Sequence, residues 1–306
     1  MGINYFKYIR HILEEIRGFV IPNSNDCKMR KVSYLASLAL GACVLFTSCS
    51  NESDVVKQDE VSESVMSALV NAGFDVTNQA PMRFENGYLV EGDIYFTDSD
   101  IANLKEGNRL PVEEQYSTDY LVSTNGSRVI TIYAPVGGRK GYSAGMIAGL
   151  DLAVARYNAQ NLEISFQRVT SSNGADISMT RLSKRDERRG VLGSAGFPTA
   201  SGDPYGEIKM SGILESSYGL STEGIATIIA HEMGHCIGFR HTDYFDRSIS
   251  CGGSTSNEGD GGVGANHIPG TPTGATWSAA SWMLACTDGG DRPFNSADET
   301  ALDYLY

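Results

Sequence analysis

Residues 231–241 read His231-Glu232-Met233-Gly234-His235-Cys236-Ile237-Gly238-Phe239-Arg240-His241, and this stretch decides what the rest of the chain must support. Four residues turn an α-helix by about 400°, so His231 and His235 stand about 40° apart on one face. Gly238 lets the chain leave the helix through a turn with positive φ, which brings His241 back toward the first two rings. The spacing therefore predicts three imidazoles that meet at one point.

Three neutral imidazoles around one point match the ligand set of a catalytic zinc ion, which keeps a fourth position open. Glu232 follows the first ligand directly and is placed to act as general base on a water there. A two-histidine pattern alone also occurs by chance, but the added Gly238 and His241 make the full pattern far more specific. We therefore expect Zn2+ held by His231, His235 and His241, with Glu232 as the catalytic residue.

The same residues resemble the HExxHxxGxxH signature of the metzincin zinc proteases. The chain also resembles the bacterial M57 family of dual-action HEIGH metallopeptidases over about residues 120–306, through the His motif and residues 242–243, 265–272 and 281–283. The resemblance implies a zinc-dependent endopeptidase that hydrolyses peptide bonds in proteins or peptides. It implies an α+β fold with a twisted mixed sheet, an active-site helix, a Met-turn and a C-terminal helix.

Met283 is the residue that matches the Met-turn below the metal, with ordinary core packing as the alternative. The chain departs from metzincins of the astacin type at Ala285, where those proteins carry a Tyr. Asp243 either orients a ligand His or caps a turn. The resemblance also implies an edge strand that pairs with extended substrate, at about residues 191–197, where Gly193 and Gly196 leave the backbone accessible.

Hydrophobic periodicity predicts the elements of this α+β fold. Strands are expected at residues 128–134, 162–169, 175–181, 190–197 and 205–214, with an earlier strand-like segment at 88–96 that Gly92 interrupts. Helices are expected at residues 61–72 and 142–160, from Ser221 or Thr222 to about Ile237, and at the C-terminus. Ser296 and Glu299 form a capping-box pattern before the last helix.

Val90-Glu91-Gly92-Asp93 resembles the FxGD motif of astacin prosegments, with Val in place of Phe. In that family the Asp fills the open position at the metal and blocks the water. The resemblance implies that Asp93 is a latency switch that keeps a precursor silent until the segment is removed. A bulge glycine followed by a surface Asp is the alternative.

The N-terminus has the pattern of a signal peptide, because a basic cluster at Lys28, Arg30 and Lys31 precedes an apolar run at residues 34–46. Residues 45–49 resemble a bacterial lipobox, which makes Cys49 the expected lipidation site and membrane anchor; plain cleavage without lipid is the alternative. We expect a leader at 1–48, a tether and prosegment at 49–115, and a metzincin-like protease domain at 116–306. The protein is then exported, as an outer-membrane or cell-surface lipoprotein or otherwise secreted.

The chain carries 24 Lys and Arg against 37 Asp and Glu, a formal net charge of −13. Nucleic acid is not an expected partner, because phosphate binding needs clustered basic residues. A non-catalytic zinc-containing surface lipoprotein that acts as a binding module is the alternative to an enzyme. Glu232 favours the enzyme, because metal retention alone needs no general base.

Three of the six cysteines lie in the body of the protein, namely Cys236, Cys251 and Cys286. At most one internal disulfide can therefore form there, and export would favour it. The spacing does not decide the pair; Cys251 with Cys286 is our expectation.

Overall fold

The computed structural model describes residues 60–306, apart from residues 75, 77, 78, 105–114, 256, 259–261 and 273–279. Every described residue belongs to one compact unit, Gln58–Tyr306. The leader expected at residues 1–48 and the lipidation site Cys49 lie outside the described residues. Within the described part of the chain, no helix has the length and apolar composition that crossing a bilayer requires.

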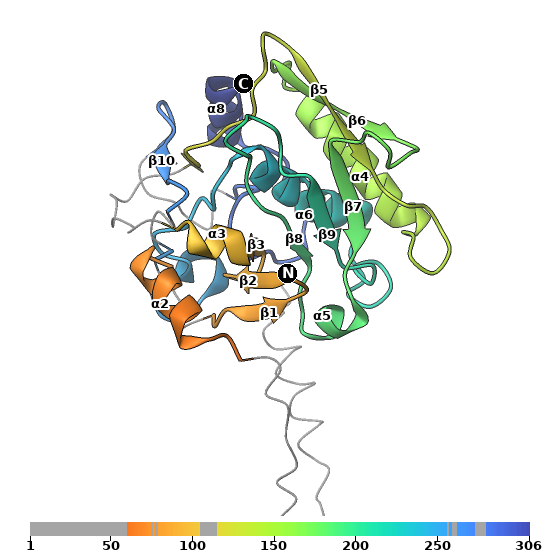
Figure 1. Cartoon of the computed structure of the whole chain (residues 1–306). Coiled ribbons are helices and arrows are strands. Elements are labelled where there is room, and N and C mark those ends of the chain that lie inside the picture. Colours follow the sequence, from red (N-terminus) through yellow and green to blue (C-terminus); the bar gives the residue numbers. More distant parts are fainter. Residues whose placement is uncertain are drawn as a thin grey trace, which may run out of the picture. The chain divides into compact units, whose positions relative to one another are not determined.

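A five-stranded sheet is the largest sheet of the described unit (Figure 1). Its strand order is β6-β5-β7-β9-β8, with β5 at Arg128–Tyr133, β6 at Ile164–Val169, β7 at Ile177–Arg181, β8 at Gly193–Ser194 and β9 at Glu207–Met210. The first four strands are parallel, and β8 is an antiparallel edge strand next to β9. The strand expected at 190–197 is reduced to two residues, because only Gly193 and Ser194 pair with β9.

Two helices, α4 (Ala144–Asn158) and α6 (Thr222–Ile237), pack on each other and share the main apolar core with this sheet. They approach closely at Gly149, where a Cβ atom would lie 2.5 Å from Cγ2 of Ile225. Ser221 caps α6 by accepting a hydrogen bond from the Gly224 amide, and Gly238 ends the helix at φ 106°. All residues of α6 from 224 to 237 are buried, which fixes the helix that carries the His motif.

The N-terminal segment forms a separate three-stranded antiparallel sheet beside β8 (Figure 1). Its elements are α2 (Glu63–Asn71), β1 (Met82–Phe84), β2 (Gly87–Val90), β3 (Ile94–Thr97) and α3 (Asp98–Ala102). The expectation of one interrupted strand at 88–96 is wrong: β2 and β3 form a hairpin. Glu91 and Gly92 both have positive φ, 55° and 97°, and therefore reverse the chain just before Asp93.

Shorter elements complete the unit: β4 (Tyr116–Ser117), α5 (Lys184–Arg188), α7 (Ser248–Cys251), β10 (Asn266–His267) and α8 (Ser296–Leu305). The capping box of α8 lies one residue earlier than expected, because Asn295 accepts the amides of Ala297 and Asp298 while Asp298 accepts that of Asn295. The described residues therefore form a mixed α+β fold, as the sequence predicts.

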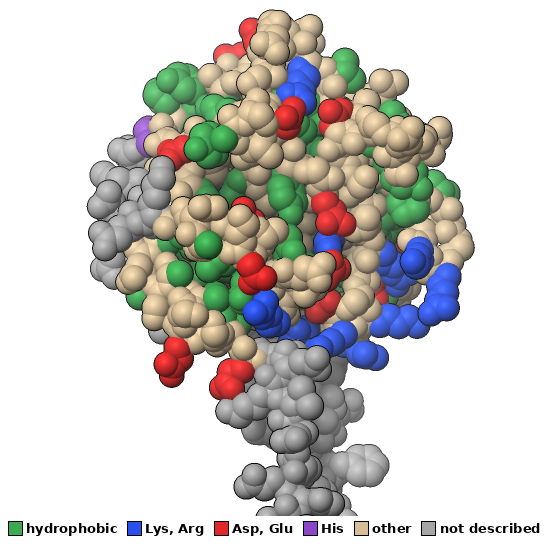
Figure 2. Space-filling model, viewed as in Figure 1, with side chains coloured by type: hydrophobic (Ala, Val, Ile, Leu, Met, Phe, Trp, Pro, Cys, Tyr) green, Lys and Arg blue, Asp and Glu red, His purple; other side chains and the backbone are tan. Residues whose placement is uncertain are grey.

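Lys and Arg side chains gather along the lower edge of the unit in Figure 2. Helix α5 lies at this edge in Figure 1, and its basic residues Lys184, Arg185 and Arg188 are exposed. The rest of the visible face mixes acidic, apolar and neutral side chains. The acidic excess of the whole chain is therefore not uniform over this surface.

Candidate metal centre

The rings of His231, His235 and His241 meet at the C-terminal half of α6. Their centroids are 4.7, 4.9 and 5.2 Å apart, and all three side chains are buried. His231 and His235 lie one turn apart on the helix, and Gly238 turns the chain so that His241 faces them. The structure thus brings together the three residues that the sequence singles out as metal ligands.

The hydrogen bonds of the three rings fix which nitrogen faces the common point. Nδ1 of His231 donates to the Trp282 carbonyl and Nδ1 of His235 to the Phe239 carbonyl, both at 2.8 Å. A carbonyl oxygen only accepts hydrogen bonds, so in these two rings the proton is on Nδ1 and Nε2 keeps its lone pair. Both Nε2 atoms are buried and have no hydrogen-bond partner among the described residues.

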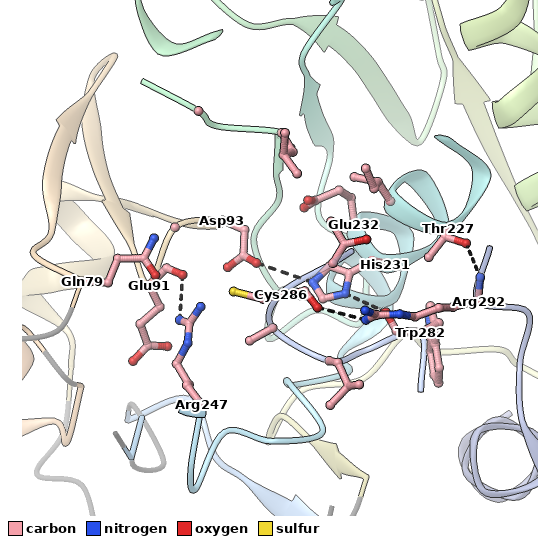
Figure 3. A pocket seen from close by; sticks show the side chains of 18 residues that line it. Gln79, Glu91, Asp93, Thr227, His231, Glu232, Arg247, Trp282, Cys286 and Arg292 are labelled. Carbon is pink, nitrogen blue, oxygen red and sulfur yellow. Dashed lines mark hydrogen bonds and ion pairs between the residues drawn. The ribbon is translucent and has the colours of Figure 1, made fainter. Parts of the chain in front are cut away.

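Asp93 projects from the β2–β3 turn toward His231 (Figure 3). Its Oδ2 atom lies 3.1 Å from Nε2 of His241 and 3.6 Å from Nε2 of His231. Ligand atoms of Asp93 and the three His all lie within 4.8 Å of one another, so the four residues fit a single metal ion. Burial alone would raise the pKa of Asp93, but the surrounding His residues hold it well below its usual value.

The carboxylate of Glu232 lies beside this cluster and contacts the edge strand β8. A Cβ atom on Gly193 would lie 2.3 Å from Oε1 of Glu232, so the glycine makes room for this carboxylate. Burial, and next the Asp93 carboxylate, raise the pKa of Glu232 well above its usual value. Oε2 of Glu232 is buried without a hydrogen-bond partner among the described residues.

Met283 lies beneath α6, where a Cβ atom on Gly234 would come 2.6 Å from its Sδ atom. Its carbonyl accepts the Thr242 amide at 2.8 Å, which connects it to the chain just after His241. The preceding residue, Trp282, supplies the carbonyl that holds His231. The turn at Met283 therefore contacts α6, which carries His231 and His235, and also the residue that follows His241.

Asp243 and a disulfide connect the loop after His241 to the loop after Met283. Cys251 and Cys286 are joined, with their Cα atoms 5.1 Å apart, while Cys236 is a buried free thiol. The carboxylate of Asp243 accepts the amides of Ala285 at 2.9 Å and Ser250 at 3.2 Å. Of the two roles expected for Asp243, these contacts support the capping of a turn, because its carboxylate accepts backbone amides.

Glu258 is a site residue that the sequence did not reveal. It is fully buried and its Oε1 atom accepts the Nδ1 proton of His241 at 2.8 Å, so it orients the third imidazole. Arg240 and Arg247 flank it at 3.5 and 3.3 Å. Burial opposes ionisation, but His241 and the two guanidinium groups lower the pKa of Glu258 to about 2.

A cavity of about 200 Å³ opens next to the cluster (Figure 3). Its walls come from β8, from α6 and from the loop after Met283, with Leu192, Ile228 and Leu284 among the apolar residues and Arg247 and Arg292 among the basic ones. The hairpin of the N-terminal segment closes its remaining side. The segment also bonds to the β8 edge, because the Tyr95 amide donates to the Ala195 carbonyl at 2.9 Å and the Ala195 amide to the Asp93 carbonyl at 3.1 Å.

One family of known proteins matches most of the chain. The model of the family described as dual-action HEIGH metallo-peptidase matches residues 88–306, and Met233 stands where the name of that family has Ile. A search of curated proteins finds no match. Among solved structures, that of myroilysin is similar at 14% identity, with a TM-score of 0.36, over 61% of this chain and 96% of the other. Because the family match spans well over half of the chain, the protein belongs to the dual-action HEIGH metallopeptidases and is a metallopeptidase.

Proposed function

We propose that this metallopeptidase is a zinc-dependent endopeptidase made as a latent precursor, with Asp93 at the fourth position of the metal. The observation that carries the proposal is the meeting of four side chains, three imidazoles and one carboxylate, within 4.8 Å of one another. The imidazole set suits zinc in particular, because neutral His nitrogens are among its preferred ligands and an open fourth position is typical of catalytic sites. Two buried Nε2 atoms without another partner among the described residues support the fit.

The residues around the metal have distinct tasks in peptide hydrolysis. Zinc, when bound, polarises the scissile carbonyl and lowers the pKa of the attacking water. Glu232 accepts the proton of that water and returns it to the leaving amine. The amide and carbonyl of Ala195, on the edge that continues β8, are positioned to bind an extended peptide.

The same edge explains why the precursor is silent in this proposal. In the described structure the Asp93 carbonyl and the Tyr95 amide take both groups of Ala195, so a substrate cannot pair there. The segment is held by further contacts: Phe84 and Leu89 pack against Leu182 and Val191 in one apolar cluster, and Lys209 forms an ion pair with Glu85. Full activation then requires both a cut after the segment and its departure from the cleft, whereas loss of the Asp93 carboxylate alone frees the fourth ligand position and gives partial activity.

Export and lipid anchoring complete the proposal. The basic cluster, the apolar run at residues 34–46 and the lipobox-like residues 45–49 support a lipoprotein leader with its lipid on Cys49. The Cys251–Cys286 disulfide supports an oxidising compartment outside the cytosol, because such bonds rarely persist among cytosolic thiols. Replacing Cys49 by Ser and following incorporation of labelled palmitate in cells tests the anchor; equal labelling of the variant would refute it.

The catalytic and latency claims are tested together on the full-length, zinc-loaded chain. Hydrolysis of casein and of a quenched peptide is measured for wild type, Asp93→Ala and Glu232→Gln, with Asp98→Ala as the control at an exposed carboxylate of the same segment. We expect Asp93→Ala to exceed the uncut wild type, Asp98→Ala to equal it, and Glu232→Gln to retain zinc without activity. Activity of Asp93→Ala no higher than uncut wild type would refute the switch. Hydrolysis by Glu232→Gln, once cut, at the rate of cut wild type would refute the mechanism.

The same measurement separates the enzyme from a binding module. Once the segment has been cut away, wild type hydrolyses casein in our account, whereas a zinc-containing binding module would not. Absence of hydrolysis by cut, zinc-loaded wild type would therefore favour the binding module.

A further inference from the structure

Arg247 lies in the cleft and has no role in the mechanism above. It comes from the loop just before α7, its side chain is only 7% exposed, and it lines the same cavity as His231 and Glu232. Figure 3 shows its guanidinium group pointing toward the hairpin of the N-terminal segment. A buried cation at a substrate cleft needs an acceptor whichever molecule fills that cleft.

Two oxygen acceptors hold the guanidinium group in place, and only one of them is permanent; Nη2 also lies 3.8 Å from Sγ of Cys251. Nη1 of Arg247 donates to the Glu91 carbonyl at 2.7 Å and lies 3.3 Å from Oε1 of Glu258. Glu258 belongs to the part of the chain after the segment, residues 116–306, which we call the catalytic part. The hydrogen bond with His241 holds Glu258 there. Glu91 belongs to the segment, so this acceptor leaves when the segment leaves. Arg247 then keeps its position through Glu258 but loses its shorter hydrogen bond.

The charge around Arg247 changes in the same step. Burial alone would lower the pKa of the guanidinium group, and four carboxyl groups together raise it. Glu258 and Asp243 belong to the catalytic part, whereas Glu91 and Asp93 belong to the segment. Departure of the segment therefore takes the Asp93 carboxylate away from Arg247, together with the Glu91 carboxyl, whose own pKa burial raises well above its usual value. It also exposes the cleft to substrate.

We infer that Arg247 binds a carboxylate of the peptide substrate in the place that the Glu91 backbone vacates. The inference rests on the proposed function, because it requires the segment to leave and a peptide to enter. A carboxylate is the chemistry that fits best: it makes charge-assisted hydrogen bonds with a guanidinium group, about twice as strong as those of a neutral carbonyl, and it restores the lost negative charge. The carboxylate comes from an Asp or Glu side chain near the scissile bond or from a free C-terminus.

The test uses the full zinc-loaded chain, folded intact and then cut within residues 105–114 at an inserted protease site. Mass spectrometry of a peptide library first locates the cleaved bonds. The ratio of kcat/KM is then measured for matched peptides with Glu or Gln at each position near the bond, and with a free acid or an amide at the C-terminus. The first pair detects a side-chain carboxylate, and the second detects a terminal one.

Wild type is expected to favour the acidic member of one pair by about tenfold or more, as hydrogen bonds to charged groups predict. Arg247→Gln should bring that ratio close to one, and Arg247→Lys should recover part of it. Arg168→Gln is the matched control, because this Arg on β6 pairs with Asp151 on α4 and does not line the cavity. No acidic preference in wild type, or the same preference in Arg247→Gln, would overturn the inference while leaving the protease intact.

A binding measurement keeps the inference testable apart from turnover. Glu232→Gln, zinc-loaded and cut in the same way, is titrated with the Glu and Gln peptides by calorimetry, with and without Arg247→Lys. Tighter binding of the Glu peptide that weakens in the Arg247→Lys background supports the carboxylate site. Equal binding of both peptides would overturn it, whereas absence of hydrolysis by cut wild type would reject the proposed function itself.

Discussion

Replacing Gly193 by Ala is the sharpest perturbation of the proposed general base, because it adds one methyl group and touches no ligand. The new Cβ atom would lie 2.3 Å from Oε1, 2.8 Å from Cδ and 2.9 Å from Cγ of Glu232. Non-bonded heavy atoms settle near 3.5 Å, so the carboxylate must move by about 1 Å. The backbone itself tolerates alanine, since Gly193 is not among the residues with positive φ.

The expected loss follows from that displacement. A shift of about 1 Å in a catalytic group costs roughly 100-fold in rate, which lies within the contribution of about 10²–10⁴ of a positioned general base. We therefore expect kcat/KM of the cut, zinc-loaded Gly193→Ala enzyme to fall about 100-fold, equivalent to about 2.7 kcal/mol in the activation free energy. Zinc content should stay at one ion per chain, because no imidazole is displaced.

Gly206→Ala is the matched control, at the residue just before β9, the strand next to β8. A Cβ atom there meets only the Asp176 carbonyl, at 3.6 Å, which is an ordinary contact. Both variants are assayed with the same quenched peptide, and their zinc content and melting temperature are recorded. Wild-type hydrolysis by Gly193→Ala with full zinc content would refute the reasoning, because it would mean that the position of Glu232 does not limit the reaction.

Three further predictions concern buried groups outside the reaction. Glu258→Gln should weaken zinc binding about 10- to 100-fold in a chelator competition, because the amide orients His241 without the negative charge; unchanged affinity would contradict this role. Burial raises the pKa of Asp298 to about 7, so its stabilising contribution fades as pH rises through that value: between pH 6 and 8 wild type should lose about 1.4 kcal/mol of unfolding free energy relative to Asp298→Asn, and a pH-independent difference would exclude the shift. Replacing Cys251 and Cys286 together by Ala should lower the unfolding free energy by about 4 kcal/mol in denaturant titrations, as a loop with a sequence separation of 35 residues implies; a loss below about 1 kcal/mol would argue against the bridge.

The metal centre could be predicted because its geometry is local. Helical periodicity alone puts His231 and His235 on one face, and a glycine at the helix end is enough to return His241 to them. The strands of the large sheet were predictable for a similar reason, since apolar alternation marks their buried faces. Their ends were not, because strand length depends on partners: β8 keeps two residues where the local pattern suggested eight.

Glu258 and Arg247 could not be predicted from sequence. Glu258 lies 17 residues after His241, beyond irregular chain without periodicity, and nothing local marks it as a partner of an imidazole. Arg247 meets the Glu91 carbonyl across 156 residues of sequence. The hairpin at Gly92 was also missed, because the single positive-φ glycine suggests a bulge, whereas Glu91 adopts the left-handed region as well and reverses the chain.

The central claim is that three imidazoles and the Asp93 carboxylate share one zinc ion in the uncut chain. Zinc X-ray absorption spectroscopy of the full-length, zinc-loaded precursor tests it most directly. The account predicts one zinc per chain with three imidazole nitrogens and one carboxylate oxygen at about 2.0–2.2 Å, and loss of the carboxylate signal in Asp93→Ala. A spectrum with fewer than three imidazoles, a shell unchanged by Asp93→Ala, or a purified chain that retains no zinc would contradict it.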